Sequence, residues 1–263
     1  MPGSLELPSD ELALLDYMAY GMIAVSIPTF LLLTFVTTAL YGRNSTQFIV
    51  PGFLPARLAW VVQELPAFVV PCLLLLATPA DRIAYLPNRV LLALFMVHYF
   101  QRSLIFPMLI RGGKPTPLIP FLLALLFCVY NGYMQARYLS QYAQYPDGWL
   151  TDPRFIVGIL MFAVGMAINL HSDHVLRNLR KPGETGYKIP QGGMFTYVSG
   201  ANFFGETLEW AGFAVACWSL QAAAFATFTA LNVGPRAYTH HKWYLQKFDS
   251  YPKGRAAIIP FLL

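Results

Sequence analysis

A stripe of polar side chains ends one apolar segment of the chain, GMAINLHSDHVLRNLRKPGE (165–184). Helical spacing places its members on one face, at i, i+4, i+8 and i+11: Asn169, Asp173, Arg177 and Arg180. Asp173 and Arg177 are four residues apart and can pair, which lowers the cost of burying either charge. A long charged side chain at a helix end can extend to the membrane–water interface, and this explains Arg180. It does not explain Asn169 and Asp173, which have short side chains and lie deeper in the apolar segment. Ionisable groups inside an apolar segment are candidates for function.

A second stripe follows in YVSGANFFGETLEW (197–210), where Asn202, Glu206 and Glu209 recur at i, i+4 and i+7. Gly200 and Gly205 would let another helix or a ligand approach the backbone closely. These side chains could simply bind a neighbouring helix. Two polar stripes on successive segments favour a shared polar cavity.

Two further groups could donate hydrogen bonds inside apolar segments. In AWVVQELPAF, Glu64 is a lone carboxyl group with Gln63 beside it and Trp60 one turn back. A carboxyl group out of water favours its neutral form, which can donate a hydrogen bond. In VHYFQR, Tyr99 is followed one turn later by Arg102. A tyrosine at this position is also typical of an aromatic membrane anchor.

The composition places these residues in a membrane protein. The chain has 263 residues, 56% hydrophobic and 12% charged, and the charged fraction is about half that of a soluble domain. The net charge of +5 comes from Lys and Arg between apolar segments, which indicates topology signals and no nucleic-acid partner. Three widely spaced cysteines predict neither a disulfide framework nor a metal site.

The pattern predicts an all-α, polytopic membrane protein, a single domain spanning residues 1–263. The expected spans are 12–41, 56–78, 89–110, 118–140, 154–177, 201–219 and 220–236. Residues 1–53 would then hold the first span and its loop. Fourteen Lys and Arg lie on one side of the membrane and four on the other, so we expect a cytosolic C-terminus and an N-terminus outside or in the lumen.

The basic, aromatic segment RAYTHHKWYLQKFDSYPKGR (236–255) follows the last span. It could lie on anionic lipid headgroups, or it could form a lid over an anionic ligand. Together with the other Lys and Arg residues on the cytosolic side of the membrane, this segment would make a basic ring at the mouth of the polar cavity. No Walker loop and no GxGxxG after a strand is present, so a nucleotide would not bind in a Rossmann domain.

At these same residues the sequence resembles the steroid 5-alpha-reductases, in particular the type 1 and type 2 enzymes, over about residues 54–263. The blocks that carry the resemblance are AWVVQELP (59–66), VHYFQR (97–102), MLIRGGKP (108–115), TDPRF (151–155), INLHSDHVLRNLRKPGETGYKIPQGG (168–193), TYVSGANFFGETLEW (196–210) and HKWYLQKFDSYPKGRAAIIPFLL (241–263). Gln101 and Thr239 depart from the residues that several relatives carry, without removing a proposed catalytic group.

The resemblance implies NADPH-dependent reduction of the Δ4 double bond of a 3-oxo-Δ4-steroid, with hydride transfer to C5 and a 5α-dihydrosteroid as product. The family's catalytic glutamate and tyrosine match Glu64 and Tyr99, which would stabilise the negative charge that builds on the C3 oxygen. The residues assigned to NADPH binding are Arg102, Arg111, Lys114, Asn169, Asp173, Arg177, Arg180, Tyr187, Asn202, Glu206, Arg236, His240 and Tyr244. Those assigned to the steroid are Trp60, Gln63, Phe127 and Phe228.

On this interpretation the steroid enters from lipid and NADPH from the cytosol. The membrane would be the endoplasmic reticulum in a eukaryote and the inner membrane in a bacterium. Three alternatives stay open: a related polyprenol-type or enoyl-thioester reductase, an isoprenylcysteine-type methyltransferase that binds S-adenosylmethionine, and a transporter or receptor. The sequence indicates neither the natural steroid nor the oligomeric state.

Overall fold

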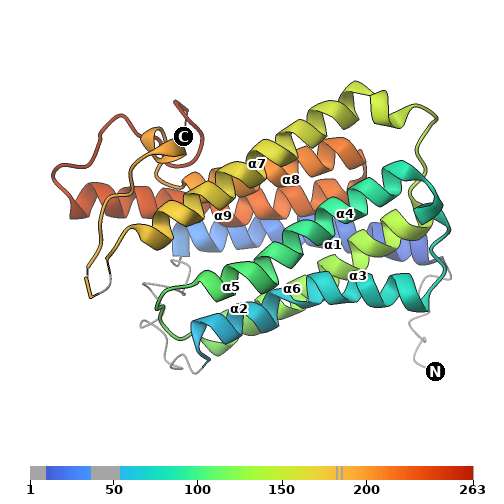
Figure 1. Ribbon diagram of the computed structural model, residues 1–263, viewed down its shortest axis with the longest axis horizontal. Coiled ribbons are helices and arrows are strands. Elements are labelled where there is room, and N and C mark those ends of the chain that lie inside the picture. The colour runs from blue at the N-terminus through green and yellow to red at the C-terminus, as the bar shows by residue number, and fades with distance from the viewer. Residues whose placement is uncertain (1–9, 37–53, 182, 185, 263) are drawn as a thin grey trace.

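The computed structural model describes residues 10–36, 54–181, 183–184 and 186–262, which form a bundle of long helices (Figure 1). The elements are α1 (Glu11–Leu31), η1 (Leu32–Val36), α2 (Ala56–Glu64), α3 (Pro66–Ala77), η3 (Asp81–Ala84), α4 (Leu86–Phe100), η4 (Gln101–Ile105), α5 (Phe106–Leu109), α6 (Leu118–Arg137), η5 (Tyr138–Tyr142), η6 (Trp149–Thr151), α7 (Pro153–Asn178), η7 (Gly193–Thr196), α8 (Ala201–Cys217) and α9 (Leu220–Lys247). The described residues form isolated β-bridges but no strand. The all-α class is confirmed.

Five helical stretches are long and apolar enough to cross a membrane: Glu11–Val36, Ala56–Ala77, Leu86–Leu109, Leu118–Tyr142 and Pro153–Asn178. They correspond to the first five predicted spans, except that residues 37–41 lie outside the described part of the chain. The sixth and seventh predicted spans are the helices α8 and α9, and their crossing of a membrane stays a prediction. Helix α9 continues to Lys247, eleven residues beyond the predicted end at 236, because no helix-breaking residue follows Pro235 until after Lys247.

Two helix interruptions lie beside the residues of chemical interest. Pro66 has no backbone N–H and begins α3, so α2 ends at Glu64 with only Leu65 between the two helices. Helix α4 ends just after Tyr99 and passes into the wider π-helical turn η4. The Ser103 hydroxyl donates a 2.6 Å hydrogen bond to the Tyr99 carbonyl oxygen across this turn. Wider turns of this kind often occur at functional sites.

Glycines bring α7 and α8 into direct backbone contact. Gly158 and Gly165 on α7 face Gly212 and Gly205 on α8 in reverse order, so the helices are antiparallel. A Cβ atom at Gly205 would lie 2.5 Å from the Asn169 nitrogen, closer than real Cβ contacts allow. Small residues therefore set this helix spacing. The close packing places the two predicted polar stripes side by side.

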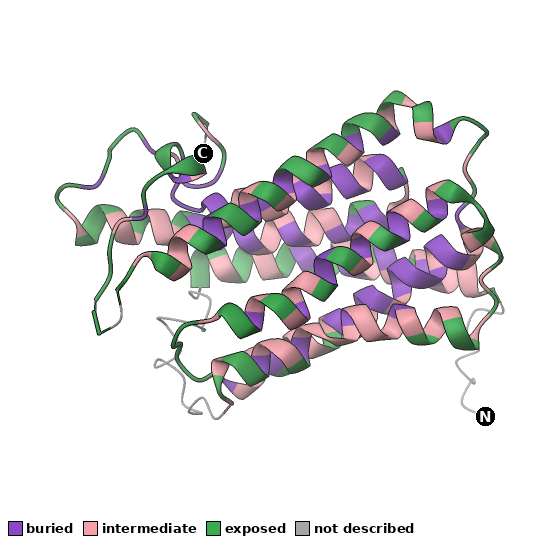
Figure 2. Cartoon of the chain, viewed as in Figure 1, coloured by how far each residue is buried: buried purple, intermediate pink, exposed green. Residues whose placement is uncertain are grey.

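Burial is concentrated on the faces that the helices turn towards one another, while the outer faces are exposed (Figure 2). Large apolar side chains on those outer faces include Leu76, Leu123, Leu126 and Leu160. An apolar outer surface of this kind suits contact with lipid.

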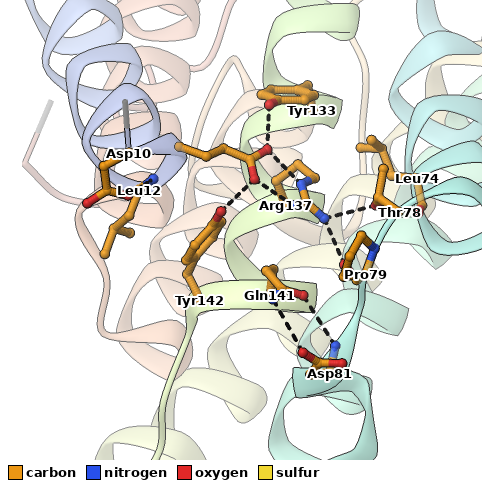
Figure 3. A network of polar contacts seen from close by, with 11 residues as sticks. Asp10, Leu12, Leu74, Thr78, Pro79, Asp81, Tyr133, Arg137, Gln141 and Tyr142 are labelled. Atoms are coloured by element: carbon orange, nitrogen blue, oxygen red, sulfur yellow. Dashed lines mark hydrogen bonds and ion pairs between the residues drawn. The ribbon is translucent and has the colours of Figure 1, made fainter. Parts of the chain in front are cut away.

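A polar network joins three helices where α1 begins, at the opposite end of the bundle from the C-terminal tail (Figures 1 and 3). Glu11 accepts hydrogen bonds from Arg137 on α6, from Tyr133 at 2.6 Å and from Tyr142 at 2.5 Å. Arg137 also donates to the Thr78 hydroxyl at the end of α3, at 2.9 Å. The network fixes α1, α3 and α6 relative to one another.

Candidate active site

Glu64 and Tyr99 contact the same turn of α6. The Cys128 sulfur lies 3.6 Å from Glu64 Oε2, and Asn131 Nδ2 donates to the Tyr99 hydroxyl oxygen at 3.5 Å. Cys128 and Asn131 are three residues apart and share one helix face. Tyr99 is buried and Glu64 is half-buried. The two groups predicted to donate hydrogen bonds therefore come from separate helices to one place.

Gln63 and Trp60 lie on the α2 side of this pair. Gln63 Nε2 donates to Glu64 Oε1 at 3.2 Å. The Arg102 guanidinium lies 4.6 Å from the centre of the Trp60 ring, and Trp60 packs edge-on against Phe106 at 5.1 Å. Arg102 thus connects the α2 residues to the π-helical turn.

Arg102 is surrounded by acidic groups from three other helices. Its Nη1 donates to Asp173 Oδ2 on α7 at 3.3 Å. Glu206 and Glu209 on α8 and Glu64 on α2 interact with it electrostatically. A single guanidinium is therefore the positive charge that these acidic side chains share, and among them Asp173 lies within ion-pair distance.

Asp173 interacts electrostatically with Arg177, as predicted, but among the described residues its ion pair is with Arg102, which the sequence did not predict. Asp173 is buried and faces the turn after α4, whereas Arg177 is half-buried and its Nη2 lies 3.4 Å from His174 Nδ1. Asn169, also buried, donates from Nδ2 to the Asn202 carbonyl oxygen at 3.0 Å. The two stripes meet as expected, and whether they line a cavity stays a prediction.

Cations lie around the end of α7 that is nearest to the C-terminal tail. Arg111 Nη1 donates to Asn178 Oδ1 at 3.0 Å, and Arg180 Nη1 donates to the Gly186 carbonyl oxygen at 3.4 Å. Lys114 is exposed in the loop before α6. We call these residues and Arg177 the basic rim; whether they surround the mouth of a cavity, as the sequence predicts, stays a prediction.

The C-terminal tail, by which we mean the basic, aromatic segment 236–255 that begins in the last turns of α9, forms an aromatic layer beside this rim together with the loop after α7. The Tyr187 ring contacts Trp243 at 4.8 Å, and Tyr244 stacks on Tyr251 at 5.2 Å with a 6° angle between the rings. On α9, Arg236 donates to Asn232 Oδ1 at 2.9 Å, and its guanidinium carbon lies 5.7 Å from the centre of the Phe203 ring on α8. The His240 ring also lies 5.7 Å from that of Phe203. These contacts place Arg236 and His240 next to the start of α8.

Ser199 connects the tail to the segment before α8. Its hydroxyl oxygen lies 2.6 Å from His241 Nδ1 and 2.6 Å from the Tyr251 hydroxyl. Burial lowers the pKa of His241 below its usual value of 6.5.

The aromatic residues predicted for the steroid are divided between two places. Phe127 and Phe228 stack at 4.6 Å, and through Phe225 they reach Trp210, whose ring lies 4.3 Å from that of Phe225. Trp210 in turn lies 6.0 Å from the Tyr99 ring. Trp60 is on the α2 side, beside Arg102, so the two aromatic groups flank the Glu64–Tyr99 pair from different helices.

Several contacts were not expected from the sequence. His98 Nδ1 lies 2.7 Å from Glu209 Oε1, and both side chains are buried. Asn131 and Gln135, buried on α6, are hydrogen-bonded to each other at 3.2 Å. Their i, i+4 spacing inside an apolar span was a signal that could have found them. Among the described residues, no group of three His, Cys, Asp or Glu side chains could hold a metal ion.

Comparison with known proteins gives consistent matches. The family model described as 3-oxo-5-alpha-steroid 4-dehydrogenase matches residues 114–263. The chain is 57% identical over 255 residues to 3-oxo-5-alpha-steroid 4-dehydrogenase 1 of Bos taurus, covering 96% of this chain and 98% of that protein. It is 55% identical to the Homo sapiens type 1 protein (86% of this chain and 87% of that protein) and 52% identical to the Homo sapiens type 2 protein (84% and 87%).

Proposed function

Because the chain belongs to the 3-oxo-5-alpha-steroid 4-dehydrogenase family of oxidoreductases, we propose that it reduces the Δ4 double bond of 3-oxo-Δ4-steroids to 5α-dihydrosteroids with NADPH. One observation carries the proposal: Glu64 and Tyr99 reach the same turn of α6 from separate helices. Two converging hydrogen-bond donors are what a carbonyl oxygen needs as it gains negative charge.

The donor set of the site fits a phosphorylated dinucleotide. Cations at the rim suit the phosphates, because arginine can bind a phosphate through two parallel hydrogen bonds. The residues there are Arg111, Lys114, Arg177 and Arg180, with Arg236, His240, Tyr187 and Tyr244 from the tail side. Deeper amides and carboxylates suit ribose hydroxyls and a carboxamide: Asn169, Asp173, Asn202 and Glu206, with Arg102 between them. NADPH bound there would supply the hydride that C5 accepts.

Glu64 and Tyr99 would act on the C3 oxygen of the steroid. The Glu64 carboxyl group and the Tyr99 hydroxyl both donate to this oxygen, and their hydrogen bonds strengthen as it becomes an enolate. The loss of one such donor typically costs about 3 kcal/mol of activation free energy. Gln63 positions Glu64, while Trp60, Phe127 and Phe228 offer flat apolar surface for the rings.

The proposed enzyme crosses the membrane seven times, with α8 and α9 as the last two spans and a cytosolic C-terminus. Two observations support this. The start of α1 and the C-terminal tail lie at opposite ends of the bundle (Figure 1), and the basic rim lies at the end with the tail. NADPH then enters from the cytosol, and the steroid enters from lipid between the helices.

The test is turnover by the full chain purified in detergent, with NADPH and testosterone or progesterone and product identification by mass spectrometry. We expect a 5α-dihydro product. An enoyl thioester, a polyprenol-type substrate and S-adenosylmethionine are assayed in parallel. Reduction of one of the other enoyl substrates alone, or binding of S-adenosylmethionine in place of NADPH, would contradict the proposal.

A further inference from the structure

The Tyr99 hydroxyl is placed at the end of a chain of buried amides. Asn131 is 0% and Gln135 is 1% exposed. Gln135 Nε2 donates to the Gln221 carbonyl oxygen at 2.9 Å and to Asn131 Oδ1 at 3.2 Å, and Asn131 Nδ2 donates to the Tyr99 hydroxyl oxygen at 3.5 Å. Three helices, α4, α6 and α9, are joined in this way.

The direction of every hydrogen bond in this chain follows from its first member. The Gln221 carbonyl can only accept, so the NH₂ end of the Gln135 amide must face it. That NH₂ group has a second hydrogen, which it donates to Asn131 Oδ1. A reversed Asn131 amide would set two NH₂ groups against each other. The NH₂ end of Asn131 therefore faces Tyr99.

An NH₂ group donates and does not accept, so the Tyr99 oxygen must be the acceptor in this contact. The phenolic hydrogen consequently cannot point at Asn131. It is left free to point away from α6. Glu64 and Glu206, on α2 and α8, are near enough to interact with Tyr99 electrostatically. A hydroxyl hydrogen that already points towards the substrate oxygen needs no reorganisation during the reaction.

We propose that Asn131 and Gln135 are positioning residues for the proposed reduction: they direct the Tyr99 hydrogen away from α6 and towards the steroid carbonyl. The inference rests on the proposed function and adds two residues that never touch the substrate. The chain is anchored at its far end, because the Gln221 side chain donates from Nε2 to Asp16 Oδ1 on α1 at 2.7 Å.

The test compares Asn131→Asp with wild type in single-turnover NADPH oxidation. The variant has nearly the same shape but lacks the NH₂ group, and its carboxyl oxygen can accept from Tyr99, so the Tyr99 hydrogen is no longer directed away from α6. We expect the rate to fall at least about tenfold, and further than in Asn131→Ala, where the hydroxyl turns freely. The Kd for NADPH and the KM for the steroid should stay within about twofold of wild type.

Two control experiments distinguish an effect on the orientation of the Tyr99 hydrogen from a general effect on the folded structure. Asn88 on α4 is equally buried and donates to the Leu139 and Ala143 carbonyl oxygens at 2.8 and 3.0 Å, away from Tyr99. Asn88→Asp should lower the Tm and leave the single-turnover rate of the folded protein unchanged. In a Tyr99→Phe background, Asn131→Asp should change the rate by less than about twofold, because the group that it directs is gone.

The inference is overturned if Asn131→Asp turns over at the wild-type rate. It is equally overturned if the loss persists undiminished with Tyr99→Phe, or follows a loss of NADPH binding. If Asn131→Asp does not fold, Asn131→Ala and Gln135→Met decide, and wild-type rates in both overturn it. A wild-type protein that reduces no 3-oxo-Δ4-steroid is a different result, because the proposed function itself then fails and the inference fails with it.

Discussion

His98 Nδ1 and Glu209 Oε1 lie 2.7 Å apart, and this buried contact joins α4 to α8 directly beside Tyr99. The other carboxylate oxygen of Glu209 is buried without a hydrogen-bond partner among the described residues. The pair fixes the end of α4 against the helix that carries Glu206. The position of Tyr99 therefore depends on a contact that does not itself include Tyr99.

Glu209→Leu should destabilise the protein strongly, because it leaves His98 buried without its partner. Removing one member of a buried pair costs about 3 kcal/mol of unfolding free energy. Thermal unfolding in detergent measures the effect. Glu184→Leu is the matched control, since this exposed carboxylate pairs with Lys188 on the surface, and its Tm should be unchanged. Equal Tm values for the two variants would contradict a structural role for the His98–Glu209 pair.

Gly165→Ala should destabilise the contact between α7 and α8. A Cβ atom at Gly165 would clash with the backbone of Glu209 and Gly205, and relieving such a clash typically costs about 1–3 kcal/mol. A Cβ atom at Gly234 on α9 would meet nothing within 4 Å beyond its chain neighbours and its own helix backbone, so Gly234→Ala should keep or raise the Tm. If Gly165→Ala unfolds at the wild-type temperature, the two helices are not in backbone contact.

Arg137→Met should lower the Tm while the folded protein keeps its steroid turnover. Arg137 is 5% exposed and holds Glu11 and Thr78 at the end of the bundle where α1 begins (Figure 3). Arg154 pairs with Asp152 at the same end but is more exposed, so Arg154→Met should have little effect. Comparable Tm losses for the two variants would show that the network contributes no special stability.

Acidification should loosen the C-terminal tail. Burial lowers the pKa of His241, so below pH 6.5 the unfolded state binds more protons than the folded state, and the stability of the docked tail falls as the pH decreases. Limited proteolysis of the tail between pH 7.5 and pH 5.5, a window spanning the usual histidine pKa of about 6.5, measures this. His241→Gln should remove most of the pH dependence, and an unchanged dependence in that variant would assign it to another group.

The sequence predicts those structural features that are determined by residues close together in the chain. The polar spacing in 165–184 and 197–210 predicts that α7 and α8 carry facing stripes. Pro66 explains the break after Glu64, which the expected span 56–78 did not include. Contacts between distant segments are not visible in this way. The ion pair between Arg102 and Asp173, the amide chain from Gln221 to Tyr99 and the π-helical turn after α4 depend on packing that only the folded bundle defines.

The most direct test of the central claim is the single-turnover rate of NADPH oxidation with a 3-oxo-Δ4-steroid in Glu64→Met and Tyr99→Phe. We expect each variant to lose about a hundredfold in rate and to keep the wild-type Kd for NADPH, because each lacks one donor to the C3 oxygen. Tyr130→Phe is the matched control, since this hydroxyl donates to the Met18 carbonyl oxygen at 2.6 Å, and its rate should be that of wild type. Wild-type rates in Glu64→Met or Tyr99→Phe would contradict the claim that these two residues polarise the steroid carbonyl.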